Sequence, residues 1–339
     1  MRFVCFGEIM GRINPLGYKR IVQSNTFEIT YAGGEANVAV SLANYGKDVS
    51  FVTKMPNNLV SESAVRSLRS HNVDTSDIVY GGDRLGLYFV EKGASQRAST
   101  VIYDRKHSAI SEAKREDFDW NKIFEGATWY HFTGITPALG ENIAEICLDA
   151  CKIAKEKGLT VSCDLNYRAK LWTPEQAGIT MAKLMPYVDI LIANEEDSEK
   201  VFGIKAPDTD VSSGELSREG YKYVAKALQD KFGICKVAIT LRTSLSATDN
   251  LWAGMLYSDG KYYFSKEYSV HIVDRVGGGD SFGGGLIYAL SENYSNQDTI
   301  EFAVAASCLK HSIEGDFNEV SVFEVKKLMN GDGSGRVQR

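Results

Sequence analysis

Apolar and polar positions alternate regularly over the second half of the chain. Short apolar runs predict buried strands, and the amphipathic stretches between them predict helices. The strands are expected at 129–133, 159–164, 188–193 and 237–241. The helices are expected at 142–157, 174–185, 195–202 and 220–231. Because strands that alternate with helices usually lie parallel in one sheet, the pattern predicts an α/β fold with a parallel central sheet covered by helices on both faces.

The first third of the chain adds a second kind of pattern. Strands are expected at 2–7 and 49–53, and helices at 35–44 and 59–70. Residues 86–92 and 99–105 alternate in polarity on either side of Gly93-Ala94-Ser95, which predicts a hairpin. With the polar, β-prone residues 12–31, the hairpin is expected to form a small sheet outside the main body. We call it the lid sheet, built from about 12–31 and 84–106.

The end of the chain predicts two more helices, at about 279–290 and 298–312. The last residues, 331–339, are rich in Gly, Asp and Arg and are expected to form a disordered tail. The sequence therefore predicts one domain over residues 1–330.

Composition narrows the classes of partner and compartment. The chain has 339 residues, is 44% hydrophobic and 24% charged, and carries a formal net charge of −6, which does not favour a nucleic-acid partner or an anionic membrane surface. No apolar run approaches the roughly 18 residues that a membrane span needs. Six cysteines without a C-x-x-C pair, and a first strand directly after Met1, predict reduced thiols, no signal peptide and a cytoplasmic location.

The most informative stretch is Gly277-Gly278-Gly279-Asp280, which opens the helix expected at 279–290. Unshielded glycine N–H groups and a helix N-terminus form a binding place for an anion, and a carboxylate beside it suits phosphoryl transfer. The alternative is a glycine-rich turn in which Asp280 is an ordinary helix N-cap. The chain has no G-x-x-x-x-G-K-[ST] motif, and the dinucleotide fingerprint fails because Phe282 stands where a third glycine is needed.

Three polar clusters follow predicted strand ends, at 164–168, 194–197 and 240–242. Ligands of parallel α/β sheets gather at the carboxyl ends of the strands. These clusters are therefore expected to line the same site as the glycine run.

Two motifs give the chain a resemblance to the ribokinase-like, or PfkB, carbohydrate kinases. Gly33-Gly34-x-x-Asn37-x-Ala39 resembles the sugar-binding element of that family, and residues 274–282, DRVGGGDSF, resemble its D-T-x-G-A-G-D-x-F motif. The resemblance covers residues 1–330. It implies a three-layer α/β/α core with a mainly parallel sheet, a small β-sheet lid, and ATP with Mg²⁺ as the phosphoryl source.

The resemblance also implies roles for individual residues. Asp280 would be the general base, with the backbone of Gly277, Gly278 and Gly279 as the anion hole. On the sugar side it implies Gly33, Gly34, Asn37, Tyr88, Tyr103, Arg105, Arg168 and Asp280. On the ATP side it implies Asn166, Arg168, Asn194, Thr240, Arg242, Gly277 and Gly279. Asn194 and Asp197 would organise Mg²⁺ through water, because Asp197 is one methylene shorter than the glutamate of the family.

Further segments, 86–91, 101–105, 164–168 and 315–318, resemble the 2-keto-3-deoxygluconate kinases within the family. That implies phosphorylation of the terminal 6-hydroxyl of 2-dehydro-3-deoxy-D-gluconate. Arg12 stands where neutral-sugar members have an aspartate, and Arg105 and Arg168 could hold a substrate carboxylate, although each alone could be a solvated surface residue. The alternatives are a fructokinase or other hexose kinase, and a non-catalytic sugar-acid sensor on the same fold.

Departures from the family pattern leave other properties open. Arg275 replaces a threonine beside Asp274, so dependence on a monovalent cation such as K⁺ is uncertain. Gly278 replaces an alanine and is expected to loosen the turn. The open lid sheet is expected to hold a homo-oligomer together, because exposed sheets tend to find partners.

Overall fold

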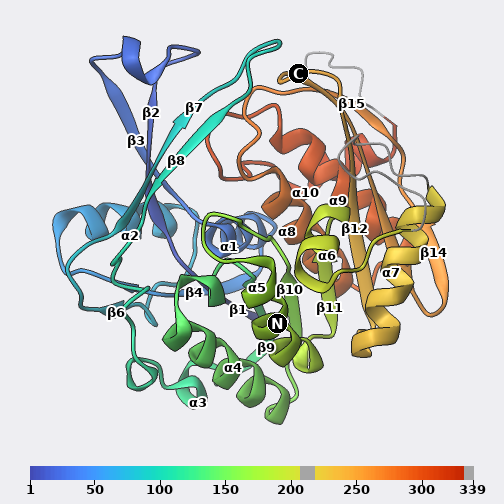
Figure 1. Cartoon of the computed structure of the whole chain (residues 1–339), viewed down its shortest axis with the longest axis horizontal. Helices are drawn as coiled ribbons and strands as arrows, with labels where there is room; N and C mark the ends of the chain where they lie inside the picture. The colour runs from blue at the N-terminus through green and yellow to red at the C-terminus, as the bar shows by residue number, and fades with distance from the viewer. Residues whose placement is uncertain (207–217, 332–339) are drawn as a thin grey trace.

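A nine-stranded sheet runs through the middle of the protein (Figure 1). The computed structural model describes residues 1–206 and 218–331, and the statements below concern these residues. Six strands lie side by side and parallel, in the order β4 (Asp48–Val52), β1 (Arg2–Phe6), β9 (Ala127–Thr133), β10 (Thr160–Asp164), β11 (Ile190–Ala193) and β12 (Lys236–Ser244). An antiparallel edge follows, with β13 (Asp249–Ser258) pairing with β12, β14 (Lys261–Phe264) and β15 (Tyr268–His271).

Helices cover both faces of this sheet because its strands are apolar on both sides. In β1, Phe3 and Cys5 face one buried cluster, and Val4 and Phe6 face the other. The first cluster includes side chains of α1 (Gly34–Asn44), α2 (Leu59–Ser70), α8 (Gly278–Ser291), α9 (Asn296–Lys310) and α10 (Val322–Met329). The second includes side chains of α3 (Trp120–Ile123), α4 (Glu141–Glu156), α5 (Pro174–Leu184), α6 (Glu195–Phe202) and α7 (Arg218–Phe232).

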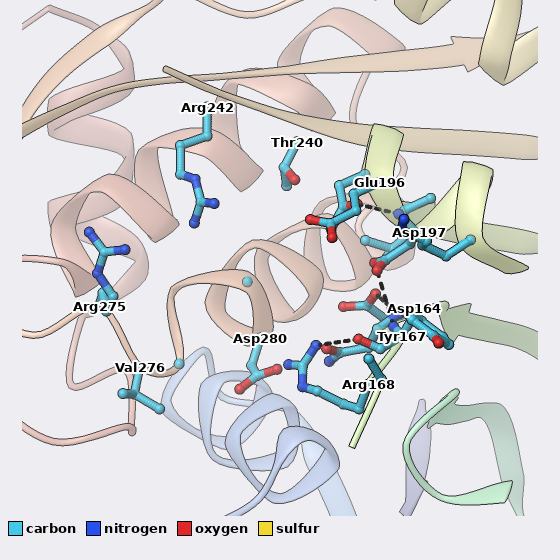
Figure 2. Close-up of a pocket in the computed structure, with 18 of the residues that line it drawn as sticks. Asp164, Tyr167, Arg168, Glu196, Asp197, Thr240, Arg242, Arg275, Val276 and Asp280 are labelled. Carbon is cyan, nitrogen blue, oxygen red and sulfur yellow. Dashed lines mark hydrogen bonds between the residues drawn. The ribbon is translucent and has the colours of Figure 1, made fainter. Parts of the chain in front are cut away.

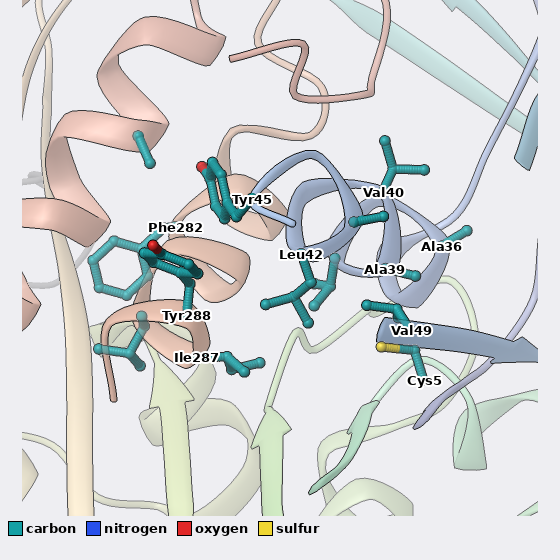
Figure 3. Close-up of a cluster of buried hydrophobic side chains, with 14 of the residues drawn as sticks. Cys5, Ala36, Ala39, Val40, Leu42, Tyr45, Val49, Phe282, Ile287 and Tyr288 are labelled. Carbon is teal, nitrogen blue, oxygen red and sulfur yellow. The ribbon is translucent and has the colours of Figure 1, made fainter. Parts of the chain in front are cut away.

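Helices α1 and α8 pack closely, and this contact positions the site described below (Figure 3). Leu42 and Ile287 are fully buried between the helices and the sheet, and the rings of Tyr45 and Tyr288 lie 5.1 Å apart. A Cβ at Gly284 would lie 2.6 Å from the Cβ of Ser41, so glycine is needed for the helices to approach this closely. The N-termini of the two helices consequently lie at the same edge of the sheet.

A second sheet of four strands projects from the main body (Figure 1). Its order is β3 (Phe27–Ala32), β2 (Met10–Pro15), β7 (Gly86–Glu91) and β8 (Thr100–Asp104), with β2 and β7 parallel. Strands β7 and β8 lie within the ranges predicted for the lid sheet, whereas β2 begins two residues before its predicted range and β3 ends one residue after it. The short strands β5 (Lys54–Met55) and β6 (Val79–Tyr80) pair beside it at its base.

The three-layer fold with its mainly parallel sheet confirms the predicted fold class. Helices α3 and α10 and the antiparallel strands β13 to β15 were not predicted. Elements α3, β14 and β15 have only four residues each, too few to show a clear period. The predicted tail, 331–339, lies outside the described residues except for Gly331. All six cysteines are free thiols. Among the described helices, none has the length and apolar character needed to cross a membrane.

Candidate active site

The glycine run lies where the loop after β15 enters α8, with Gly278 and Gly279 as the first two residues of the helix. Gly277 is the N-cap of α8 and has a φ of 82°, in the left-handed region that favours glycine. A Cβ there would lie 2.0 Å from the carbonyl oxygen of Asp316. A Cβ at Gly278 would lie 2.6 Å from the His311 ring. Glycine at 278 therefore has a packing role that the sequence analysis did not foresee: the imidazole of His311 occupies the space that a side chain would need.

Asp280 is the third residue of α8, so the alternative that it caps the helix is wrong. Its carboxylate oxygen Oδ2 accepts a hydrogen bond of 2.6 Å from the amide of Asn37 on α1. Burial raises the pKa of Asp280 to about 6, and the Asn37 hydrogen bond opposes this shift. Asp280 is thus mostly ionised at neutral pH and has a pKa suited to accepting a proton.

The Gly33-Gly34 pair places the N-terminus of α1 against Asp280. A Cβ on Gly33 would lie 1.9 Å from the carbonyl oxygen of Glu8, which explains why glycine is needed at an extended position. The Cβ position of Gly34 lies 3.6 Å from a carboxylate oxygen of Asp280. The amide N–H of Gly33 donates to the side-chain oxygen of Asn37. Asn37 therefore links the two helix N-termini.

A pocket of about 800 Å³ opens on one side of Asp280 (Figure 2). All of the residues predicted for the ATP side line it: Asn166, Arg168, Asn194, Thr240, Arg242, Gly277 and Gly279. Figure 2 also shows a residue that the sequence analysis did not assign to ATP, Arg275, on the same side as Arg242. Burial lowers the pKa of Arg275 and the nearby charge of Arg242 lowers it further. Two neighbouring guanidinium groups favour an anion between them.

The opposite side of this pocket is acidic and carries Asp164, Glu196 and Asp197 (Figure 2). Burial raises the pKa of Asp164 well above its usual range, and the charges of Asp197 and Asp280 raise it further. The side-chain oxygen of Asn194 accepts from the backbone N–H of Asp197 and so caps α6, while Asp197 accepts from the N–H of Tyr167. The sequence analysis expected Asp164 and Glu196 at this site only as members of the polar clusters at strand ends, and it gave neither of them a role.

The acidic side fits Mg²⁺ in a particular way. Within the described residues, no group of three or more His, Cys, Asp or Glu side chains is arranged to hold a metal ion. Mg²⁺ is commonly bound by one or two carboxylates, water and substrate phosphates, which is the donor set that Asp164 and Asp197 could complete. The residues therefore fit a metal that arrives with a polyphosphate and is contacted partly through water.

A smaller recess lies on the other side of Asp280. It is lined by all of the residues predicted for the sugar side: Gly33, Gly34, Asn37, Tyr88, Tyr103, Arg105, Arg168 and Asp280. The recess and the larger pocket share Asn166, Arg168, Val276 and Asp280. Asp280 thus stands where the two spaces meet.

Arg105 is buried in this recess, so the interpretation as a solvated surface residue is wrong for it. Its Nε donates to Glu8 at 2.7 Å, and its Nη2 donates to the same carboxylate oxygen. Ser108 donates to the other oxygen of Glu8 at 2.6 Å. The sequence analysis missed Glu8, which follows the end of β1 and could have been found by the strand-end rule used for the later strands.

Arg12 has a different role from the one its position suggested. It is 1% exposed, and its two terminal nitrogens donate to Asp274, at 2.5 Å, and to Asp316. Tyr88 also donates to Asp316, at 2.7 Å. The charge of Arg12 is therefore neutralised inside the protein, and the guanidinium connects the lid sheet to the glycine loop instead of standing free for a substrate carboxylate.

Comparisons with known proteins show which proteins the chain is similar to. Residues 2–318 match the family described as pfkB family carbohydrate kinase. A solved 2-dehydro-3-deoxygluconokinase of Thermotoga maritima is 54% identical, superposes with a TM-score of 0.94, and each chain covers 98% of the other. The 2-dehydro-3-deoxygalactonokinase of Haloferax volcanii is 30% identical over 98% of both chains. A putative ribokinase II of E. coli, solved with ATP and Mg²⁺, shares the fold with a TM-score of 0.79 and 18% identity, covering 97% of this chain and 98% of its own.

The packing of His311 against Gly278 makes a testable prediction. Gly278→Ala should lower the free energy of unfolding by about 1–3 kcal/mol, because the new methyl group overlaps the imidazole. Thermal and urea unfolding measure this. Gly279→Ala is the matched control, since nothing lies within 4 Å of its Cβ position. If the double variant Gly278→Ala/His311→Ala is no more stable than expected from the sum of the single changes, this explanation is wrong.

Proposed function

The chain belongs to the pfkB family of carbohydrate kinases, and from this we propose that it transfers the γ-phosphoryl group of ATP to the 6-hydroxyl of 2-dehydro-3-deoxy-D-gluconate. The observation that carries the proposal is the position of Asp280 at the junction of a pocket with paired arginines and a recess that contains sugar-binding candidates. The similarity to kinases of deoxy keto-sugar acids supports the choice of substrate.

In the proposed reaction, the carboxylate of Asp280 accepts the proton of the 6-hydroxyl while that oxygen attacks the γ-phosphorus. The new O–P bond forms as the bond between the γ-phosphorus and the β–γ bridging oxygen breaks, and ADP leaves. The N–H groups of the Gly277–Asp280 loop and the N-terminus of α8 stabilise the negative charge that spreads over the transferred group. Arg242 and Arg275 are placed to hold the remaining phosphates.

Mg²⁺ would neutralise phosphate charge and keep the β- and γ-phosphates in a reactive arrangement. Asn194, Asp197 and Asp164 are the residues that would face it. The charge of Asp197 raises the pKa of the buried Asp164, and a nearby cation would favour the ionised form of Asp164.

The hydrogen bonds of Arg105 and Arg168 in the recess support the proposal of an acidic substrate. Arg105 is oriented by Glu8 and Ser108, and its Nη1 makes no hydrogen bond within the part of the chain that the structure describes. Arg168 donates from Nη1 to the carbonyl of Tyr167 and also lies beside Asp280. A carboxylate bound by these guanidinium groups would receive charge-assisted hydrogen bonds that a neutral ketose cannot use.

We further propose that the outer face of the lid sheet binds a second copy of this chain. Cross-strand pairing places Ile29, Ile13, Phe89 and Ile102 in one row across all four strands. Ile29 is 58% exposed and Ile102 50% exposed. The opposite face carries Arg12, Tyr88 and Tyr103, and the two tyrosines line the recess. An uncovered apolar sheet face of this kind favours self-association.

Asp280→Asn should lower kcat by about 10²–10⁴-fold with little change in KM, because the amide keeps the shape of the side chain but cannot accept the proton. In the wild type, kcat/KM should fall as the pH drops through about 6, where Asp280 becomes protonated, and should level off at higher pH. A coupled ADP assay between pH 5 and 8 measures both effects. An Asp280→Asn variant that keeps full activity would exclude Asp280 as the base. A variant whose kcat/KM falls at low pH in the same way as that of the wild type would exclude it too.

Arg168→Ala should raise KM for 2-dehydro-3-deoxy-D-gluconate by about 10–100-fold, the value of one or two charge-assisted hydrogen bonds. KM for fructose should change much less, because a neutral ketose has no carboxylate for Arg168. Glu8→Gln is the matched control: it loosens Arg105 without removing its charge, so the preference for the acid should persist. Equal effects on both sugars would contradict the carboxylate assignment, and better turnover of fructose by the wild type would favour a hexose kinase.

The lid proposal predicts that the wild type is at least a dimer at micromolar concentration. Ile29→Asp/Ile102→Asp should be a monomer, because two buried charges would face each other across the interface. Light scattering coupled to size-exclusion chromatography measures the mass. Ile179→Asp on α5 is the control, since Ile179 is 58% exposed but lies away from the lid. A monomeric wild type would refute the proposal.

A further inference from the structure

Lys310 is a buried cation that the proposed reaction does not use. It is the last residue of α9 and is 0% exposed. Its ammonium donates to two main-chain carbonyl oxygens, those of Asp274 at 3.3 Å and Ile313 at 3.2 Å. A lysine is rarely buried completely without an ion pair or a specific role, because removing the ammonium from water is costly.

The surroundings of Lys310 explain why a positive charge is needed there. Arg12 bridges Asp274 and Asp316, so these three side chains together carry one excess negative charge. Burial lowers the pKa of Lys310, but the charges of Asp274 and Asp316 oppose that effect. The ammonium of Lys310 therefore balances the charge of the group.

The side chains of Arg12, Asp274 and Asp316 also support residues 274–280, which we call the anion-binding loop. The carboxylate of Asp274 accepts hydrogen bonds from the N–H groups of Val276, at 3.2 Å, and Gly315, at 3.3 Å. The carbonyl of Asp316 packs against Gly277, and the carbonyl of Asp274 is the one that Lys310 holds. Lys310 thus contacts the first residue of the loop whose later N–H groups face the transferred phosphoryl group.

We propose that Lys310 is a positioning residue that acts as a built-in monovalent cation beneath the anion-binding loop, so that the protein needs no K⁺ or NH₄⁺ from solution. The ammonium holds the Asp274 and Ile313 carbonyls together and neutralises the excess charge of the Asp274–Asp316 pair. Removing its side chain would leave a space of ammonium size lined by carbonyl oxygens beside two carboxylates. Oxygen donors of this kind bind K⁺ and NH₄⁺. The expected effect of Lys310 on kcat rests on the proposed function, whereas the binding of K⁺ or NH₄⁺ to a variant without the Lys310 side chain does not.

The test compares wild type, Lys310→Ala and Lys310→Met in tetramethylammonium, Na⁺, K⁺ and NH₄⁺ chlorides at constant ionic strength. Wild-type kcat should be the same in all four salts. Lys310→Ala should lose about 10²-fold in kcat in tetramethylammonium, the cost of a displaced catalytic loop, and K⁺ or NH₄⁺ should restore at least tenfold. Lys310→Met fills the space without a charge and should not be rescued. Lys152→Ala, at an exposed lysine on α4, is the control.

A second measurement needs no sugar substrate. The Tm of Lys310→Ala should rise with the concentration of K⁺ or NH₄⁺ but not of tetramethylammonium, and the Tm of the wild type should not depend on the cation. Such shifts would support the proposal even if 2-dehydro-3-deoxy-D-gluconate proved not to be the substrate. Tenfold activation of the wild type by K⁺ would overturn the proposal. This measurement remains decisive even if neither Lys310 variant folds. A folded Lys310→Ala with no cation-dependent change in Tm or kcat would overturn it as well.

Discussion

The hydrogen bond between Asn37 and Asp280 joins two helix N-termini that lie 243 residues apart in the sequence. It exists because α1 and α8 pack closely over the same edge of the sheet, and that packing depends on small residues such as Gly284 against Ser41. Gly33 and Gly277 each leave room for a main-chain carbonyl, from Glu8 and Asp316 respectively. The proposed catalytic site therefore depends on close packing of the backbone. Only a few side chains in it would carry the chemistry.

Charge is distributed around this contact in separate regions. Arg242 and Arg275 lie on one side of the larger pocket, and Asp164, Glu196 and Asp197 lie on the other (Figure 2). Asp280 lies between these regions, with a pKa of about 6 that reflects burial, opposed by the Asn37 amide. An acidic chain can in this way offer a local site for an anion, because Arg242 and Arg275 stand together where the anionic group would bind.

The lid sheet is amphipathic, and each face has a separate consequence. Its inner face carries Arg12 and Tyr88, which bind Asp316 and so tie the lid to the segment that packs against Gly277. Its outer face carries the apolar row that includes Ile29 and Ile102. The two faces of the lid sheet are therefore tied to different partners: the inner face to the chain's own glycine loop, and the outer face to the proposed second copy.

The sequence by itself determined the layered α/β fold, the position of the glycine loop and many of the residues that line both sides of Asp280, although not Glu8 or Arg275. The fold and the glycine loop followed from local signals, namely apolar periodicity, the glycine run and polar residues at strand ends, whereas most of the individual lining residues followed from the resemblance to the PfkB kinases. The tertiary structure alone decided the partners of charged side chains. Arg12 is neutralised by Asp274 and Asp316, Arg105 by Glu8, and Gly278 is required by His311. Each of these contacts joins residues 33 to 304 positions apart, and such contacts depend on how distant segments pack, which neither propensity nor spacing encodes.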